Sequence, residues 1–186
     1  MSVRESLLAV LTLGPAYGAQ LHAELLSRLG HRRDINVGQI YATLDRLGKN
    51  ALVRDSGTTS DGLPLYELTS AGRLAAREWL SVVGPAQLDW NEMLDQLLVA
   101  SSLPGVNLDM LLAQHRELWA APLLQQVEPE SVQDALATAS EDELRAAALR
   151  WLDACERAAG AAAAGGAAIS RPLSDARPRR GRRPAA

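Results

Sequence analysis

Cysteine and long apolar runs are scarce in this chain of 186 residues. Cys155 is the only cysteine, so no disulfide can form within the chain, which fits a reducing compartment. No stretch of 18 consecutive apolar residues occurs, so we expect no membrane-spanning helix. Arg4 and Glu5 precede an amphipathic helix, which is unlike a secretory signal. These absences predict a cytoplasmic protein.

The side chains of catalytic and metal centres are equally sparse. His22, His31 and His115 are scattered and lack the spacing of metal ligands. Neither a phosphate-binding glycine-rich loop nor any other catalytic constellation stands out. We therefore expect no enzyme activity, no metal and no cofactor.

Charge is distributed unevenly, although the net charge is only −3. Residues 1–80 hold nine basic and eight acidic groups, residues 81–170 hold four and thirteen, and residues 171–186 hold six arginines and one aspartate. Arginine outnumbers lysine 18 to 1, which suggests a G·C-rich bacterial genome. With the changes in composition, this predicts three parts: a first domain over residues 1–83, a helical region over 84–158 and a disordered tail over 159–186.

The most informative segment is residues 37–47, with the sequence VGQIYATLDRL. Ile40, Leu44 and Leu47 recur at helical spacing and predict a helix with one buried face. The opposite face carries residues that are small or able to approach base edges and phosphates: Gly38, Gln39, Ala42, Thr43 and Arg46.

The elements predicted around this helix complete a winged helix-turn-helix. The pattern predicts helices over residues 6–13, 17–29 and 70–82 and hairpin strands over residues 52–56 and 63–69. Asn36 and Thr69 are the expected N-caps. The fold class is therefore mainly α with a small β wing, an arrangement that fits the major groove of DNA.

Three segments of this region resemble the PadR family of bacterial transcriptional regulators. They are residues 13–21 (LGPAYGAQL), 38–47 (GQIYATLDRL) and 65–73 (LYELTSAGR). The resemblance, which their order and spacing carry, covers the first 80 residues. It implies a winged helix-turn-helix, a helical C-terminal region that pairs two protomers, and repression of nearby genes.

Two features depart from that family. The family usually has glycine where this chain has Ala51, so we expect Asn50 to take over the turn after the third helix. The family's wing is often basic, whereas residues 57–65 contain no lysine or arginine. A neutral wing with Asp61 at its tip should hold phosphates weakly.

Candidate DNA contacts follow from the helix pattern and from charge. Gln39 can pair with adenine, Thr43 can serve a base or a phosphate, and the Tyr41 hydroxyl can reach a phosphate. The helix N-terminus near Gly18 favours anions. The predicted set is Tyr17, Gly18, Arg32, Arg33, Gly38, Gln39, Tyr41, Thr43, Arg46 and Lys49. For each of them a solvated surface residue is the alternative.

The second half is predicted to be helical throughout. Apolar spacing predicts helices from Trp90 to Pro104, from Asn107 to Pro122 and from Glu130 to Thr138. A capping box over residues 140–143 predicts that another helix opens there. From Ala158 onward we expect disorder.

Trp79, Trp90 and Trp119 are candidates for a small aromatic effector site or for the dimer interface, with ordinary core packing as the alternative. The arginines of residues 177–184 (RPRRGRRP) surround an Arg-Gly-Arg, as in minor-groove AT-hooks. This tail either adds affinity for DNA, solubilises the chain or screens the acidic half.

The sequence therefore predicts a sequence-specific DNA-binding transcriptional repressor that acts as a homodimer on palindromic operators, with a small aromatic molecule as a candidate effector. A winged-helix protein-interaction module that does not read DNA is the alternative, favoured by the neutral wing and the overall acidity. Within DNA binding, a MarR-like regulator is the other candidate, although helices normally precede its winged module.

Overall fold

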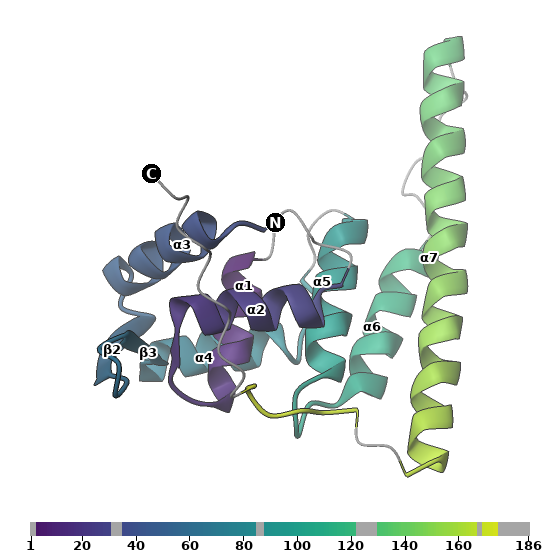
Figure 1. Cartoon of the computed structure of the whole chain (residues 1–186). Coiled ribbons are helices and arrows are strands. Elements are labelled where there is room, and N and C mark those ends of the chain that lie inside the picture. Colours follow the sequence, from purple (N-terminus) through teal and green to yellow (C-terminus); the bar gives the residue numbers. More distant parts are fainter. Residues whose placement is uncertain (1–2, 31–34, 85–87, 122–129, 167–168, 175–186) are drawn as a thin grey trace, which may run out of the picture.

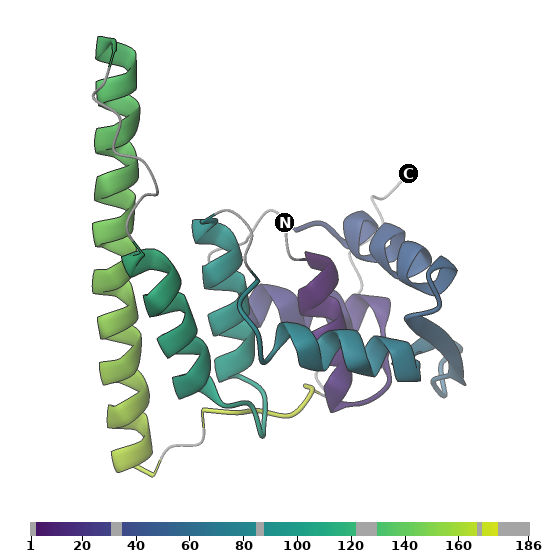
Figure 2. The same ribbon diagram turned by 180° about the vertical axis from the view of Figure 1, so that it is seen from behind.

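The computed structural model describes residues 3–30, 35–84, 88–121, 130–166 and 169–174. These residues form a mainly helical molecule with one small antiparallel sheet, which confirms the predicted fold class (Figures 1 and 2). None of the described helices combines the length and the hydropathy that crossing a bilayer requires.

The first helices form the predicted helix-turn-helix. They are α1 (Val3–Val10), which continues into the short 3-10 helix η1 (Leu11–Leu13), α2 (Gly18–Arg28) and α3 (Val37–Lys49). The apolar stripes of these helices meet in one core, in which Leu7, Leu21, Leu25 and Ile40 are fully buried. The Asn36 side chain accepts a hydrogen bond from the backbone N–H of Gln39, which confirms the predicted N-cap of α3.

The sheet has a third strand that the sequence pattern did not predict. The wing strands β2 (Val53–Thr58) and β3 (Pro64–Leu68) pair as expected, and β1 (Ala16–Tyr17) adds to the free side of β3. Ala16 lies opposite Tyr66, and Tyr17 lies opposite Leu65. A strand of two residues has no periodicity to detect, so only its pairing with β3 defines it.

The turn after α3 corrects one prediction. Ala51, and not Asn50, takes the left-handed conformation, with φ of 54° against −88° for Asn50. The Ala51 N–H donates to the Gly48 carbonyl and the next N–H donates to that of Leu47, so the turn is hydrogen-bonded in spite of its side chain.

Helix α4 (Ser70–Trp79) leaves the wing, and its start explains one glycine of the third family-like segment. Thr69 caps the helix by accepting from the Gly72 N–H, as predicted. A Cβ on Gly72 would lie 1.9 Å from the backbone oxygen of Leu52, so only glycine allows α4 to pass this close to the wing.

Helices α5 (Trp90–Ser101) and α6 (Leu108–Ala120) join the end of α4 through side-chain amides. Gln96 donates to the backbone oxygens of Trp79 and Val82. Gln114 donates to the Ser81 oxygen and accepts from the Val83 N–H. We call α1 to α4 with the three-stranded sheet the winged unit. Because α1 also packs against α5, a single core of buried residues runs from the winged unit into the helical region.

Helix α7 (Val132–Ala164) is one continuous helix of 33 residues, where two shorter helices were predicted. The predicted capping box over residues 140–143 lies inside it, and Ser131 is its N-cap instead. Alanines on both sides of that box favour an unbroken helix, since alanine has the highest helix propensity. In Figures 1 and 2, α6 packs along α7, while the N-terminal part of α7 projects beyond the other helices.

The expected disorder from Ala158 onward is also wrong for part of the tail. Residues 159–164 complete α7, and residues 169–174 run back across the molecule to α2 (Figure 1). We call residues 169–174 the C-terminal clasp. The arginine-rich residues 177–184 lie outside the described part of the chain.

Candidate DNA interface

Helix α3 is held by a buried stripe and presents its other side outward. Ile40, Leu44 and Leu47 are at most 1% exposed and pack into the core. The outward side offers Gly38, Tyr41, Ala42, Arg46 and Lys49 as exposed residues and Gln39 as a half-exposed one. The helix thus has the amphipathic character that its sequence predicted, with small residues and longer polar ones on its free face.

Thr43 does not belong to that free face, which corrects the prediction. Its side chain is only 5% exposed, and its hydroxyl donates to the Gln39 carbonyl at 2.8 Å. Together with Ile40, Leu44 and Leu47 it completes the spacing i, i+3, i+4, i+7 of a buried helix face. Because threonine is polar, the sequence analysis assigned Thr43 to the exposed face, although its spacing places it on the buried face.

The cations of α3 differ in their surroundings. The Arg46 guanidinium donates through Nε to the Ala42 carbonyl at 3.2 Å and remains on the surface. Lys49 pairs with Asp45 at 2.7 Å, so part of its charge is neutralised within the helix.

Arg4 joins this surface although the sequence pattern did not single it out. A hollow of about 250 Å³ between the start of α1 and α3 is lined by Arg4, Gln39 and Arg46 among others. A lone arginine near the start of a chain has no pattern that would connect it with α3, so only the packing of the two helices brings these groups together.

The start of α2 is more closed than predicted. Gly18 is buried, and a Cβ at this position would lie 2.5 Å from the ring of Tyr41. Tyr17 is half-buried in the sheet, whereas Tyr41 is 41% exposed. Tyr41 therefore covers the first turn of α2 and itself forms the surface there. Burial raises the pKa of the neighbouring Tyr66 hydroxyl, and Tyr41 and Asp55 add to the rise, so Tyr66 stays protonated at neutral pH.

The wing offers little free positive charge. Arg54, its cation, pairs with Glu67 across the two strands at 2.6 Å. The loop between the strands has no lysine or arginine, and the Asp55 carboxylate accepts a hydrogen bond from the Gly57 N–H. Arg32 and Arg33, the predicted cations between α2 and α3, lie outside the described residues.

A small cavity lies where the winged unit meets α5 and α6. Its lining includes Trp79, Gln96, His115 and Trp119, and its volume is about 60 Å³, room for one or two water molecules. Since the Gln96 amide donates to the end of α4, its oxygen faces His115 Nε2, which donates to it at 2.6 Å. Burial lowers the pKa of His115 to about 4, so its ring is neutral near pH 7.

This leaves two buried polar atoms at the cavity without a protein partner, the acceptor Nδ1 of His115 and the donor Nε1–H of Trp79. The other tryptophans pack on one another. Trp90 contacts Trp119 edge to face at 6.4 Å and Trp151 at 5.7 Å between ring centroids. Trp119 is only 2% exposed, as the core-packing alternative requires. Among the described residues no cluster of histidine, cysteine or carboxylate side chains could hold a metal ion.

Comparison with known proteins bears on the winged unit. Residues 7–78 match the model of the transcriptional regulator PadR-like family. A solved structure, Bacillus subtilis PadR in complex with operator DNA, is 18% identical over 81% of this chain and 96% of its own, with a TM-score of 0.41. No curated protein matches the chain. The match spans α2, α3 and the wing, so over residues 7–78 this chain is similar to the PadR-like family of transcriptional regulators.

Proposed function

We propose that this protein is a transcriptional regulator, a repressor that binds palindromic DNA as a homodimer with α3 in the major groove. The observation that carries the proposal is the division of α3 into a buried stripe and a free face of small and polar residues. A helix seated on its domain in this way can enter the groove with its side chains toward base edges.

Within that face the roles follow from the chemistry of each group. Gln39, half-exposed near the start of α3, can make a bidentate contact with adenine. Arg46, Lys49 and Tyr41 are our candidates for phosphate contacts, together with Arg4. Lys49 and Arg4 would exchange their pairs with Asp45 and Glu5 for phosphates. We exclude Thr43, whose hydroxyl is engaged with its own helix. We assign the wing a minor part because the loop between its strands has no lysine or arginine and Arg54 is paired with Glu67.

The homodimer is supported by the projecting part of α7. Val132, Leu136 and Leu144 are 70%, 66% and 40% exposed, and at about 100° per residue they lie within about 120° of the helix circumference. Apolar side chains in such a row lose contact with water when a second copy covers them. Two winged units held by this region could occupy half-sites about one turn of DNA apart.

Ligand response, the last part of the proposal, rests on the joint between α4 and α6. The unpartnered atoms of Trp79 and His115 are groups that a ligand could satisfy. A pocket for an aromatic molecule needs about 300 Å³ or more, so the present cavity of about 60 Å³ would have to open. Such opening would change the angle between the winged unit and the helical region.

The DNA-reading role is tested by Gln39→Ala, measured by fluorescence anisotropy on the DNA upstream of the protein's own gene and on a scrambled duplex. We expect the variant to lose about 1–3 kcal/mol of preference for the specific duplex. Gln133→Ala, the same chemical change on α7, is the matched control. A full-length protein that binds both duplexes equally would instead support the interaction-module alternative.

A further inference from the structure

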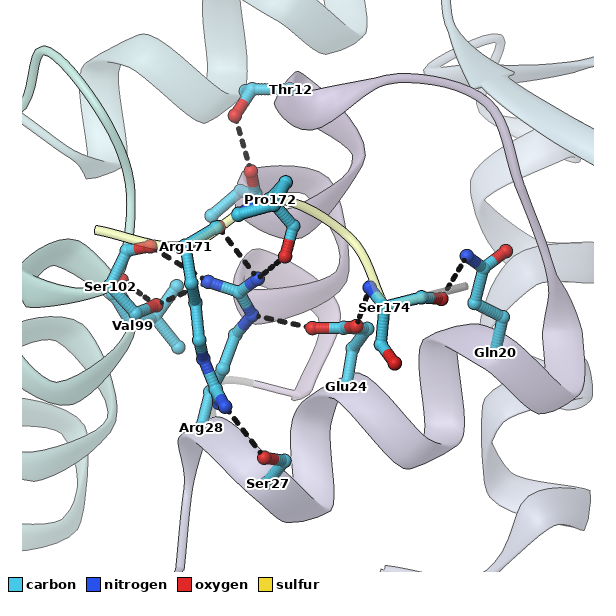
Figure 3. A network of polar contacts seen from close by, with 11 residues as sticks. Thr12, Gln20, Glu24, Ser27, Arg28, Val99, Ser102, Arg171, Pro172 and Ser174 are labelled. Atoms are coloured by element: carbon cyan, nitrogen blue, oxygen red, sulfur yellow. Dashed lines mark hydrogen bonds and ion pairs between the residues drawn. The ribbon is translucent and has the colours of Figure 1, made fainter. Parts of the chain in front are cut away.

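The C-terminal clasp docks on α2, the helix that precedes α3, through a dense set of polar contacts (Figure 3). Arg171 donates from its backbone N–H to the Ser102 carbonyl and from its guanidinium to the Ser27 hydroxyl at 2.9 Å. The Ser174 N–H donates to Glu24 at 2.6 Å, and the Gln20 amide donates to the Ser174 carbonyl at 2.9 Å.

Arg28 is the centre of these contacts. Its side chain is fully buried, and it donates through Nε to Glu24 at 2.9 Å. One of its remaining nitrogens donates to the carbonyl and hydroxyl of Ser102, and the other donates to the carbonyls of Arg171 and Pro172. A single guanidinium thereby joins α2, the end of α5 and the clasp.

The contacts also set the direction of the chain. From Arg171 to Ser174 the partners on α2 change from Ser27 to Glu24 and then to Gln20. The clasp therefore runs toward the N-terminus of α2, where Gly18 lies under the exposed ring of Tyr41. Ser174 thus accepts a hydrogen bond from Gln20, which lies two residues after the Gly18 that Tyr41 covers.

We infer that the clasp delivers the arginine-rich tail to DNA, where the tail binds phosphates beside each half-site. Five arginines follow Ser174 within nine residues, and only Asp175 opposes them. An extended chain spans about 3.3–3.6 Å per residue, so these arginines reach at most roughly 10 to 32 Å from Ser174. The tail carries five arginines, whereas the loop of the wing has no lysine or arginine and Arg54 is paired with Glu67.

This inference rests on the proposed function. Measurements on three proteins distinguish a failure of the inference from a failure of the proposed function. The first is the full-length chain. The second has the five tail arginines changed to glutamine: R177Q, R179Q, R180Q, R182Q and R183Q. The third, Leu173→Ser with Ser174→Pro, keeps every charge but loses an apolar contact of the clasp and the N–H that donates to Glu24. Ala176→Pro, a proline beyond the clasp, is the matched control.

Affinity for the DNA upstream of the protein's own gene is measured between about 50 and 200 mM KCl, after circular dichroism has confirmed equal folding. The glutamine variant should lose about 0.9 of the slope of log K against log salt for each arginine that reaches a phosphate. The unclasped variant should keep the slope but bind DNA about fourfold more weakly. In the full-length chain Arg180 lies six residues beyond its anchor at Ser174, whereas in the variant it lies 14 residues beyond Gly166. The longer tether lowers the effective concentration of the arginines at the DNA.

An unchanged slope in the glutamine variant would overturn the inference, as would full affinity in the unclasped variant. Tighter binding without the arginines would also overturn it and would assign the tail to the acidic helical region. If the full-length chain fails to bind DNA at all, the proposed function fails first and the inference with it.

Discussion

Helices α2 and α3 carry the same ion-pair spacing in opposite surroundings. In α2, Arg28 lies 2.9 Å from Glu24, and the two side chains are 0% and 4% exposed. In α3, Lys49 lies 2.7 Å from Asp45, with exposures of 73% and 61%. Both pairs join residues i and i+4 at similar distances, so neither spacing nor distance tells what the pair contributes.

The surroundings decide the difference. A buried guanidinium must satisfy all of its donors within the protein, and Arg28 does so by gathering backbone and hydroxyl oxygens from α5 and the clasp. Burial lowers the pKa of Arg28, and its pairing with Glu24 offsets part of that fall. On α3 the solvent screens the pair, which leaves that helix free for a partner.

Arg28→Met gives the largest expected effect. Removing the cation leaves the buried Glu24 carboxylate without its ion-pair partner, so we expect the free energy of unfolding to fall by about 3–5 kcal/mol. Chemical denaturation measures this. Glu24→Met combined with Arg28→Met should lose less, because no unpaired charge remains. Equal losses in the two proteins would show that the pair itself is unimportant.

His115 extends the comparison to a buried group that stays neutral. Its pKa is about 4 in the folded chain and about 6.5 when unfolded, so above pH 6.5 it is neutral in both states. As the pH falls below 6.5 the unfolded chain takes up the proton first, and by pH 5 stability should drop by about 2 kcal/mol from this group. Denaturation of the wild type and His115→Gln from pH 7 to pH 5 isolates the difference. Parallel pH profiles would contradict the assignment.

The turn that ends α3 holds an alanine in a strained conformation, and the variant Ala51→Gly tests this strain. Ala51 holds a positive φ of 54° after α3, a conformation that glycine adopts without strain. We expect stabilisation of about 0.5–1 kcal/mol, since relief of the left-handed strain slightly exceeds the entropy cost of glycine. Thermal unfolding measures the change, with Gly48→Ala inside α3 as a control for helix propensity. A destabilised Ala51→Gly protein would mean that the turn carries no strain.

Lys49→Met should give the smallest effect. An exposed i,i+4 pair contributes at most about 0.5 kcal/mol, so stability should barely change. Binding to DNA should nevertheless weaken and become less dependent on salt if Lys49 reaches a phosphate. A loss of stability like that of Arg28→Met would remove the contrast between the two helices.

Local patterns predicted much of the winged unit. The spacing of Ile40, Leu44 and Leu47 predicted the buried face of α3. Asn36 and Thr69 cap α3 and α4, as their side chains predicted. These features depend on neighbours within about one turn of helix, which the sequence alone contains. Predictions failed where polarity was taken as exposure, as for Thr43, whose hydroxyl is satisfied by its own helix.

Other features depend on partners far away in the chain. Strand β1 exists because Ala16 meets Tyr66, and the clasp exists because residues more than 140 positions apart share hydrogen bonds. The ion pair of α2 is visible as spacing, but its burial is not. No local pattern records that α5 and the clasp cover it.

The sequence by itself determined the helices around the wing, where the caps of α3 and α4 fall and which face of α3 is apolar, because periodicity and capping act over a few residues. Only the tertiary structure decided which charges are buried, which tyrosine covers the start of α2 and where the chain beyond α7 returns. Those outcomes depend on desolvation and on hydrogen bonds between distant segments, and both arise only when the elements pack together.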